Sequence, residues 1–325
     1  MAEVTLREAI RQGLREEMER DERVFLIGED IGAYGGTYAV TRGFLQEFGE
    51  KRVVDAPIAE AGIIGTAVGA AMAGLRPVAE MMSVNFTLLA LDQIVNNAAK
   101  MHSMFGGHFT APLVIRINTG FGQLAATHSQ NFDPWFAYVP GLKVVTPATP
   151  YDAKGLLKAG IRDLDPVIYL EHGALYNLKG EVPEEEFEVP IGRAEVKREG
   201  SDVTIVAYSR MLHVSLRAAD RLAAEGIECE VVDLRSLRPL DTETVLQSFR
   251  KTNRAVVAEE AWRTCGLGAE IAARIQEEGF DYLDAPVARV AAPEVPMPYA
   301  RELERLAIPD EEDVIRAVKQ VVGTE

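Results

Sequence analysis

The sequence predicts an α/β protein built from two domains, each organised around a largely parallel sheet. Its 325 residues exceed the length of one typical domain. Short apolar runs alternate with helical patterns along the chain, and this alternation stops near residue 182 and resumes near residue 201. Strands separated by helices pair in parallel, with helices covering both faces of the sheet.

The first series opens with a helix and continues as strand–helix alternation. Thr5 and Glu8 have the spacing of a capping box. An apolar residue then recurs every fourth position, at Leu6, Ile10, Leu14 and Met18. The strands expected next are 23–28, 53–55, 77–82, 112–117, 142–146 and 167–171. The helices expected between them are 58–74, 87–104 and 150–163.

A break and a second series follow. Residues 183–200 hold two prolines, the acidic run 184–186 and weak periodicity, which predicts a solvated linker between domains 1–182 and 201–325. The second series predicts strands at 203–207, 230–233, 255–259 and 287–291. Its expected helices are 211–225, 241–251, 266–278 and 310–321.

Composition excludes several classes of protein. With 34 basic and 50 acidic residues the formal net charge is −16, which argues against nucleic-acid and membrane-surface partners. Cys229 and Cys265 are the two cysteines and make neither a disulfide framework nor a zinc pattern. No apolar run reaches 18 residues, and the first residues lack a signal-peptide pattern, so we expect a cytoplasmic protein.

Polar side chains follow the expected strands of the first domain where ligands collect in open parallel sheets. Glu29 and a glycine-rich run at 32–36 follow the first strand, and Glu60 comes after the second. Phe86 follows the third strand, and His128 lies in the segment after the fourth. These residues form the candidate site, although the glycines at 32–36 are also typical of a simple turn.

The sequence allows two interpretations of Glu60 and favours neither. Glu60 directly precedes the uncharged segment 61–74, and Pro57 is placed for the first turn of the same helix. A helix that is apolar on all sides is expected to be buried. A carboxylate entering apolar surroundings can share a proton with a bound base. Alternatively, Glu60 only complements the positive end of its helix.

The other candidates each carry an ordinary alternative. His128 lies in a polar segment and could act as an acid or base, though most loop histidines are simply solvated. Phe86 could stack on a ring, but core packing is commoner for a lone aromatic. We interpret His213 and Cys265 as structural. The run 266–271 fails as a dinucleotide fingerprint because its last position is Ile271, and no other phosphate-binding loop occurs.

Several blocks of sequence together resemble the beta subunit of 2-oxoacid dehydrogenases, the thiamine-diphosphate-dependent first components of large multienzyme complexes. They are residues 52–62 (RVVDAPIAEAG), 70–77, 92–96, 128–130, 140–145, 228–239 and 295–300. The resemblance covers essentially the whole chain. It implies a pyrimidine-binding α/β domain of thiamine-diphosphate enzymes followed by a transketolase C-terminal-type α/β domain. In this family the alpha subunit holds magnesium and the diphosphate through a Gly-Asp-Gly…Asn motif, and this sequence contains no Gly-Asp-Gly.

The resemblance also implies roles for residues. Glu60 matches the glutamate that hydrogen-bonds a pyrimidine nitrogen of thiamine diphosphate, and Phe86 matches an aromatic that packs on the same ring. Glu29 matches an acid near that ring, and His128 matches a histidine that handles protons during acyl transfer to a lipoyl sulfur. A potassium ion is implied at backbone carbonyls of Leu113, Gly160, Asp163 and Asp165.

The implied assembly has two alpha and two beta chains and docks on a lipoyl-bearing dihydrolipoyl acyltransferase core. The implied reaction is oxidative decarboxylation of a 2-oxoacid. Pyruvate is the favoured substrate, with acetoin or a branched-chain 2-oxoacid as alternatives. A non-catalytic scaffold subunit is the alternative from a different class, because fold alone does not fix function. The segment 61–74, rich in small residues, is our candidate for close packing between chains.

Overall fold

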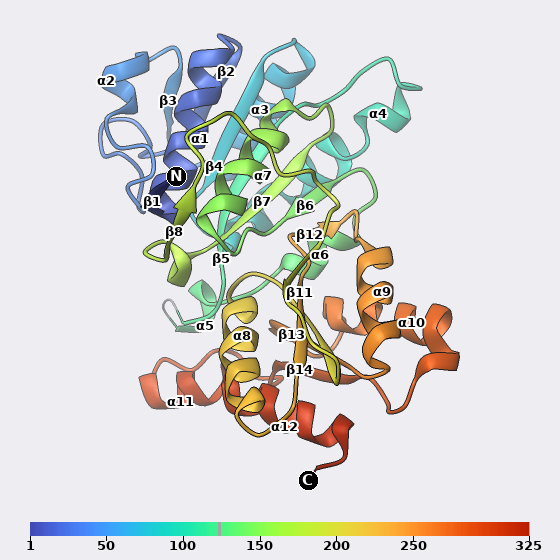
Figure 1. The fold of residues 1–325 in the computed structure, drawn as a ribbon. Helices are drawn as coiled ribbons and strands as arrows, with labels where there is room; N and C mark the ends of the chain where they lie inside the picture. The colour runs from blue at the N-terminus through green and yellow to red at the C-terminus, as the bar shows by residue number, and fades with distance from the viewer. Residues whose placement is uncertain (123–124, 325) are drawn as a thin grey trace. The chain divides into compact units, whose positions relative to one another are not determined.

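The computed structural model describes residues 1–122 and 125–324, and the chain forms two compact units (Figure 1). Unit 1 comprises Met1–Thr119 and Trp135–Ile191, and unit 2 comprises Gly120–Pro134 and Gly192–Glu325. The sequence did not indicate that residues 120–134 group with unit 2. The grouping of residues 120–134 with unit 2 is important for the candidate site, because these residues include His128.

Unit 1 is built on six parallel strands in the order β6-β7-β5-β4-β2-β3. They are β2 (Val24–Glu29), β3 (Val53–Ala56), β4 (Arg76–Met81), β5 (Val114–Thr119), β6 (Lys143–Val145) and β7 (Val167–His172). Each begins within two residues of its predicted position. The predicted parallel sheet of the first domain is therefore confirmed.

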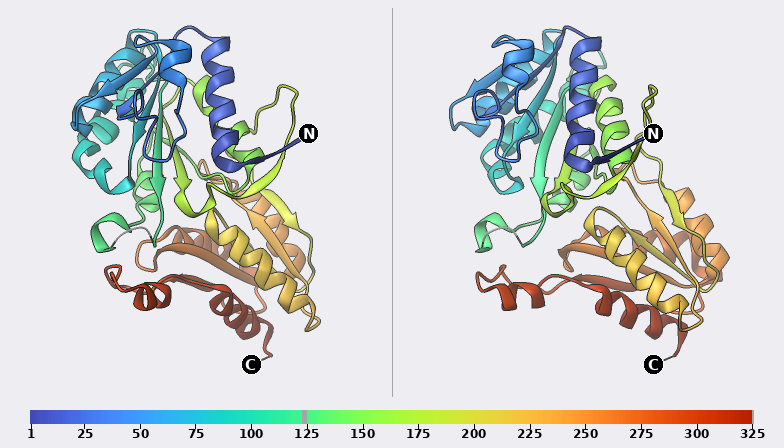
Figure 2. Two further views of the ribbon diagram at one scale, coloured as in Figure 1. Left: turned by 90° about the vertical axis from the view of Figure 1, so that its left-hand side faces the viewer. Right: turned by 60° about the vertical axis from the view of Figure 1, so that its left-hand side comes forward.

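One face of this sheet is covered by α1 (Leu6–Arg20) and α7 (Pro150–Arg162), which lie side by side (Figure 2). The Thr5 hydroxyl accepts the Glu8 backbone N–H at 3.2 Å, so the predicted helix start is present. The predicted stripe is fully buried against the sheet: Leu6, Ile10, Leu14 and Met18 are at most 2 % exposed. Burial of such side chains contributes about 1.5–3 kcal/mol each.

On the sheet's other side, α3 (Glu60–Met72) packs against β4 and against the segment that follows β4. The single helix predicted at 87–104 is wrong. The chain there forms a 3₁₀ segment η1 (Val84–Ala90), a π-helical turn η2 (Gln93–Ala98) and the short α4 (Met101–Met104). Ser83 caps the start of η1 by accepting the Asn85 N–H.

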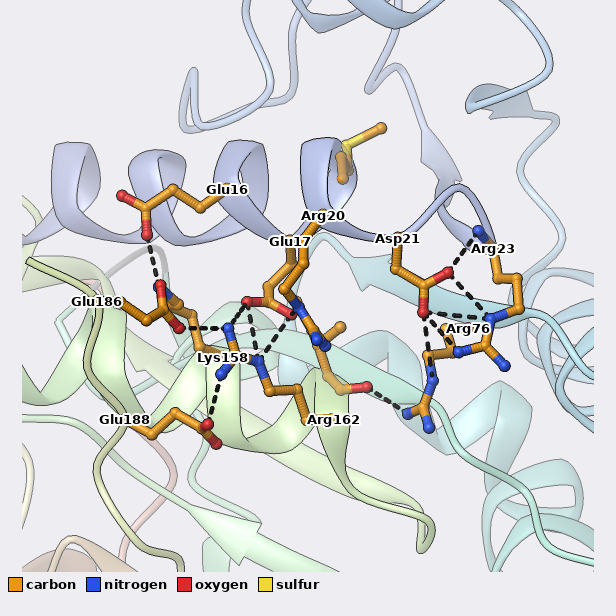
Figure 3. Close-up of polar contacts among 12 residues, drawn as sticks. Glu16, Glu17, Arg20, Asp21, Arg23, Arg76, Lys158, Arg162, Glu186 and Glu188 are labelled. Atoms are coloured by element: carbon orange, nitrogen blue, oxygen red, sulfur yellow. Dashed lines mark hydrogen bonds and ion pairs between the residues drawn. The ribbon is translucent and has the colours of Figure 1, made fainter.

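The end of the acidic run, in the predicted linker, contacts α7. Glu186 forms ion pairs with Lys158 and Arg162 of α7 (Figure 3). Arg162 also pairs with Glu17 of α1, so one guanidinium joins α1, α7 and the segment that follows β8 (Lys179–Val182). The Lys158 and Arg162 contacts lower the pKa of Glu186 to about 2. Residues up to Ile191 consequently belong to unit 1.

Unit 2 contains a five-stranded sheet in the order β14-β13-β10-β11-β9, in which only β9 is antiparallel to its neighbour among the described strands. Helices α8 and α12 pack together on one face, and α9 and α10 pack together on the other (Figure 1). The strands are β9 (Glu195–Arg198), β10 (Val203–Ala207), β11 (Cys229–Asp233), β13 (Ala255–Trp262) and β14 (Ala288–Ala292). The helices are α8 (Arg210–Ala223), α9 (Thr242–Thr252), α10 (Leu267–Gly279), α11 (Arg301–Leu306) and α12 (Glu311–Val322).

The remaining elements are short. They are β1 (Ala2–Thr5), which pairs antiparallel with β8, and α2 (Phe44–Phe48), α5 (Ala125–His128), α6 (Asp133–Tyr138), η3 (Gly173–Leu175), β12 (Ser236–Arg238) and η4 (Phe280–Tyr282). No helix within the described residues is long and apolar enough to span a bilayer. Both cysteines are free, Cys229 buried and Cys265 exposed.

Candidate active site

The glycine-rich segment after β2 forms a loop whose backbone is held by hydrogen bonds to a neighbouring strand. The Asp55 carboxylate at the end of β3 accepts the backbone N–H of Gly32 at 2.6 Å and that of Ala33 at 3.2 Å. A Cβ at residue 32 would lie 2.6 Å from Asp55 Oδ2, so only glycine fits there. Gly35 and Gly36 have φ values of +86° and +78°, which also favour glycine. Asp55 thereby fixes the loop over the carboxyl edge of the sheet.

Glu29 and Glu60 are neighbours at this edge. Glu29 is the last residue of β2 and half-buried, and Glu60 is the first residue of α3 with 9 % of its surface exposed. Burial raises the pKa of Glu29, and the charges of Asp30 and Glu60 raise it further.

Phe86 joins the same side of unit 1. It lies in η1, against which α3 packs, and its side chain is half-buried. The fold therefore brings the segments that carry Glu29, Glu60 and Phe86 together around the edge formed by β2 and β4. Two carboxylates with an aromatic ring suit a ligand that has both hydrogen-bonding nitrogens and a flat π-face.

A buried ion cluster, which the sequence analysis did not single out, lies in the strands below this edge. Arg116 of β5 donates to Glu80 of β4 at 2.7 Å and to Glu171 of β7 at 2.6 and 2.9 Å. The Tyr176 hydroxyl donates to Glu171 at 2.8 Å. A signal was present in the sequence: Glu80, Arg116 and Glu171 each lie among apolar residues of a strand, and buried charges are rare unless they are paired.

This ion cluster also contacts the glycine-rich loop. A Cβ at Gly36 would lie 3.1 Å from Glu80 Oε1, so the loop backbone sits directly on the cluster. Burial raises the pKa of Glu80, and Arg116 opposes that rise. The cluster thus supports the loop and the edge from within the sheet.

His128 belongs to unit 2, whereas Glu29, Glu60 and Phe86 belong to unit 1. It ends the short α5 and is half-buried, and the Thr127 Oγ1 lies 3.1 Å from its Nδ1. The residues flanking it line a cavity of about 480 Å³ in unit 2. The lining is Ala126, Thr127, Gln130, Trp262, Thr264, Glu294, Val295 and Pro296.

The four residues expected to bind potassium lie at the end of α7 and just before β5 and β7. The Leu113 carbonyl accepts the Val167 N–H at 2.9 Å, and the Gly160 carbonyl accepts the Asp163 N–H at 3.3 Å. The Asp163 carbonyl accepts from Arg76 at 3.0 Å. A potassium ion would have to use the second lone pair of each of these three oxygens.

The chain matches two protein families along its length. Residues 2–179 match the transketolase pyrimidine binding domain, and residues 192–314 match the transketolase C-terminal domain. A solved structure described as a split-gene transketolase, inactive beta4 tetramer, is similar with a TM-score of 0.79 and 26 % identity, covering 98 % of each chain.

Relatives from bacteria and mammals share half of the sequence. The pyruvate dehydrogenase E1 component subunit beta of Rickettsia felis is 50 % identical over 98 % of each chain. The mitochondrial subunit of the same name from Bos taurus is 50 % identical over 99 % of this chain and 91 % of its own. The family match and these relatives agree on both halves of the fold.

Proposed function

The chain belongs to the family of pyruvate dehydrogenase E1 beta subunits, which are thiamine-diphosphate-dependent proteins of the transketolase type, and we propose that it supplies the pyrimidine-binding half of a cofactor site completed by an alpha subunit. The observation that carries the proposal is the position of Glu60. It starts α3 with 9 % exposure, beside Glu29 at the carboxyl edge of a parallel sheet.

Thiamine diphosphate, when bound, supplies the electron sink for decarboxylation of the 2-oxoacid. The Glu60 carboxyl would hold a proton at a pyrimidine nitrogen. Glu29, whose pKa is raised by burial and by the charges of Asp30 and Glu60, would lie near the same ring. Phe86 would pack on the pyrimidine face.

His128 would move a proton during acyl transfer to a lipoyl sulfur. Its place beside the cavity in unit 2 and its contact with Thr127 support that role. We propose pyruvate as the substrate because the relatives above carry it in their names, with acetoin and branched-chain 2-oxoacids as the alternatives. The cytoplasmic location remains a prediction from the sequence.

The proposed assembly contains two alpha and two beta chains and docks on a lipoyl-bearing acyltransferase core. Magnesium and the diphosphate are assigned to the alpha chain, because no Gly-Asp-Gly occurs in this one. Potassium at Leu113, Gly160, Asp163 and Asp165 remains a prediction. Its test is whether potassium, but not sodium, raises the unfolding temperature of the assembled complex.

The test of the proposed function is Glu60→Gln in the complex reconstituted with the alpha chain. Because the glutamine amide cannot take up and release a proton as the carboxyl group does, the rate of decarboxylation should fall by at least about 100-fold while assembly persists. Glu50→Gln, an exposed glutamate of the same unit, is the matched control and should retain activity. Wild-type turnover in Glu60→Gln would refute the proton-sharing role and favour the scaffold alternative.

A further inference from the structure

The segment that carries His128 is anchored to unit 2 at its start by Phe121. The Phe121 backbone N–H donates to Glu260 Oε1 of β13 at 2.5 Å, and the group is buried. The Phe121 ring lies 5.4 Å from that of Trp262 and is 5 % exposed. It shares an apolar cluster with Met297 and Ala307.

The carboxylate that receives Phe121 is itself oriented. Arg210, the first residue of α8, donates to Glu260 Oε2 at 3.1 Å, and the Glu260 side chain is 5 % exposed. Arg210 also donates to the Pro309 carbonyl at 3.3 Å. One oxygen of Glu260 is thus held by a cation, while the other faces the Phe121 N–H. A buried charged acceptor makes a stronger bond than a neutral one.

The segment is buried again directly after His128. Ser129 is fully buried, and Asp133 is 1 % exposed. Asn131 Nδ2 donates to Asp133 Oδ2 at 3.0 Å, and the Asp133 N–H donates to Asn131 Oδ1 at 3.0 Å. His128 therefore lies between two fixed points in unit 2, next to Thr127 and Gln130 of the 480 Å³ cavity. Trp262 belongs both to that cavity and to the contact with Phe121.

We propose that Glu260 is a positioning residue for His128: by fixing Phe121, it holds the His128 segment where the acyl group is passed on. This inference rests on the proposed role of His128 and is independent of the chemistry at Glu60. A displacement of about 1 Å in a catalytic group can cost about 100-fold in rate, so loss of the anchor should be visible in one half-reaction.

The experiment compares Glu260→Ala, Glu260→Gln and the matched control Glu259→Gln in the complex with the alpha chain. Glu259 is the preceding residue of the same strand, and its Oε1 accepts from Gly268 and Arg289 rather than from Phe121. Three quantities are measured: hydrogen exchange at Phe121 and residues 125–134, pyruvate decarboxylation with an artificial electron acceptor, and reductive acetylation of a free lipoyl domain.

We expect Glu260→Ala to speed exchange and to lower reductive acetylation by about 100-fold while decarboxylation with the artificial acceptor is retained. Glu260→Gln keeps an oxygen acceptor for Phe121 and should recover most of the loss. Glu259→Gln should leave both the exchange of the segment and the acetylation unchanged.

Unchanged exchange in Glu260→Ala would overturn the inference, as would an equal fall in both reactions, which is the mark of a merely structural role. The variant His128→Ala distinguishes failure of the Glu260 inference from failure of the proposed role of His128. If acetylation falls in His128→Ala but not in Glu260→Ala, the inference alone fails. If His128→Ala acetylates normally, the proposed role of His128 fails, and the positioning role of Glu260 with it.

Discussion

At the scale of single residues, buried carboxylates are either paired or made neutral, and this chain contains both cases. Glu171 is 1 % exposed and accepts from the Arg116 guanidinium and the Tyr176 hydroxyl. Glu259 is also 1 % exposed, yet its Oε2 has no hydrogen-bond partner among the residues that the structure describes. Burial raises the pKa of Glu259 to about 7, although Gly268 and Arg289 oppose that rise.

The raised pKa of Glu259 predicts a pH-dependent gain from Glu259→Gln. The folded state binds this proton more tightly than the unfolded chain does, so the contribution of Glu259 to stability falls as pH rises from about 4.5 to about 7. Glutamine stays neutral and keeps an acceptor for Gly268. The variant should match the wild type near pH 4.5 and be more stable at pH 8, by about 3 kcal/mol at most. Urea unfolding at the two pH values measures this, and a gain that shrinks with rising pH would contradict it.

Removal of Arg116 should destabilise the protein, because it leaves two buried carboxylates without their cation. Arg116→Leu strands Glu80 and Glu171 in the sheet, which should cost about 3–5 kcal/mol of unfolding free energy. The control is Arg316→Leu, which removes a surface pair with Asp313 and should cost less than about 1 kcal/mol. Equal costs in denaturant titrations would show that the cluster under the glycine-rich loop does not stabilise unit 1.

At the scale of elements, α3 departs from the expectation of a helix buried on all sides. Ile63, Ile64 and Ala67 are buried, but the opposite face is open. That face exposes only small, uncharged residues, namely Ala61, Gly62, Thr66, Gly69 and Ala73. Contacts within the chain do not require glycine at residue 69, since a Cβ there meets no atom within 4 Å. We therefore retain this face as the proposed contact with another chain of the assembly.

Gly69→Leu tests this contact more cleanly than a change at Gly65, whose Cβ would lie 3.6 Å from Gln93 Cγ. Leucine improves helix propensity by about 1 kcal/mol, so the chain alone should be no less stable. Association with the alpha chain should nevertheless be lost, as seen in native mass. Ala273→Leu, at an exposed position of α10, is the control and should assemble normally. A full-mass assembly with Gly69→Leu would exclude this face as the interface.

Periodicity predicted the central elements well and the edges poorly. The parallel strands and the long helices of both units lie within a few residues of their predicted positions, because their apolar patterns are set by burial. The strands β1, β8 and β9 were missed because most of their residues are exposed or half-buried, so that they carry no apolar run, and β12 was missed as well. Over 87–104 the chain changes from a 3₁₀ to a π-helical form, a difference in hydrogen bonding that an apolar pattern does not resolve.

The candidate site residues could be predicted from the sequence, but the residues that hold them in place could not. Glu29, Glu60 and Phe86 follow strand ends, a position that the sequence reveals. The assignment of His128 to unit 2 depends on Glu260 and Trp262, which are more than 130 residues away in the chain, so no local pattern signals it. Such contacts are products of tertiary packing.

At the scale of the whole molecule, the central claim is that the chain holds half of a cofactor site. Unit 1 offers carboxylates and an aromatic ring for a pyrimidine. The sequence contains no Gly-Asp-Gly with which to hold a diphosphate. The glycine-rich loop at 32–36 is committed to Asp55 and to the buried cluster rather than open to a phosphate. The proposed function therefore makes activity depend on a partner chain.

Affinity isolation of the chain from its own cells, with partners identified by mass, tests this claim most directly. The account predicts recovery of an alpha chain that carries Gly-Asp-Gly…Asn, together with a lipoyl-bearing acyltransferase, and thiamine-diphosphate-dependent decarboxylation of pyruvate by the isolated complex. Recovery of this chain alone, with full activity and no alpha chain, would contradict it.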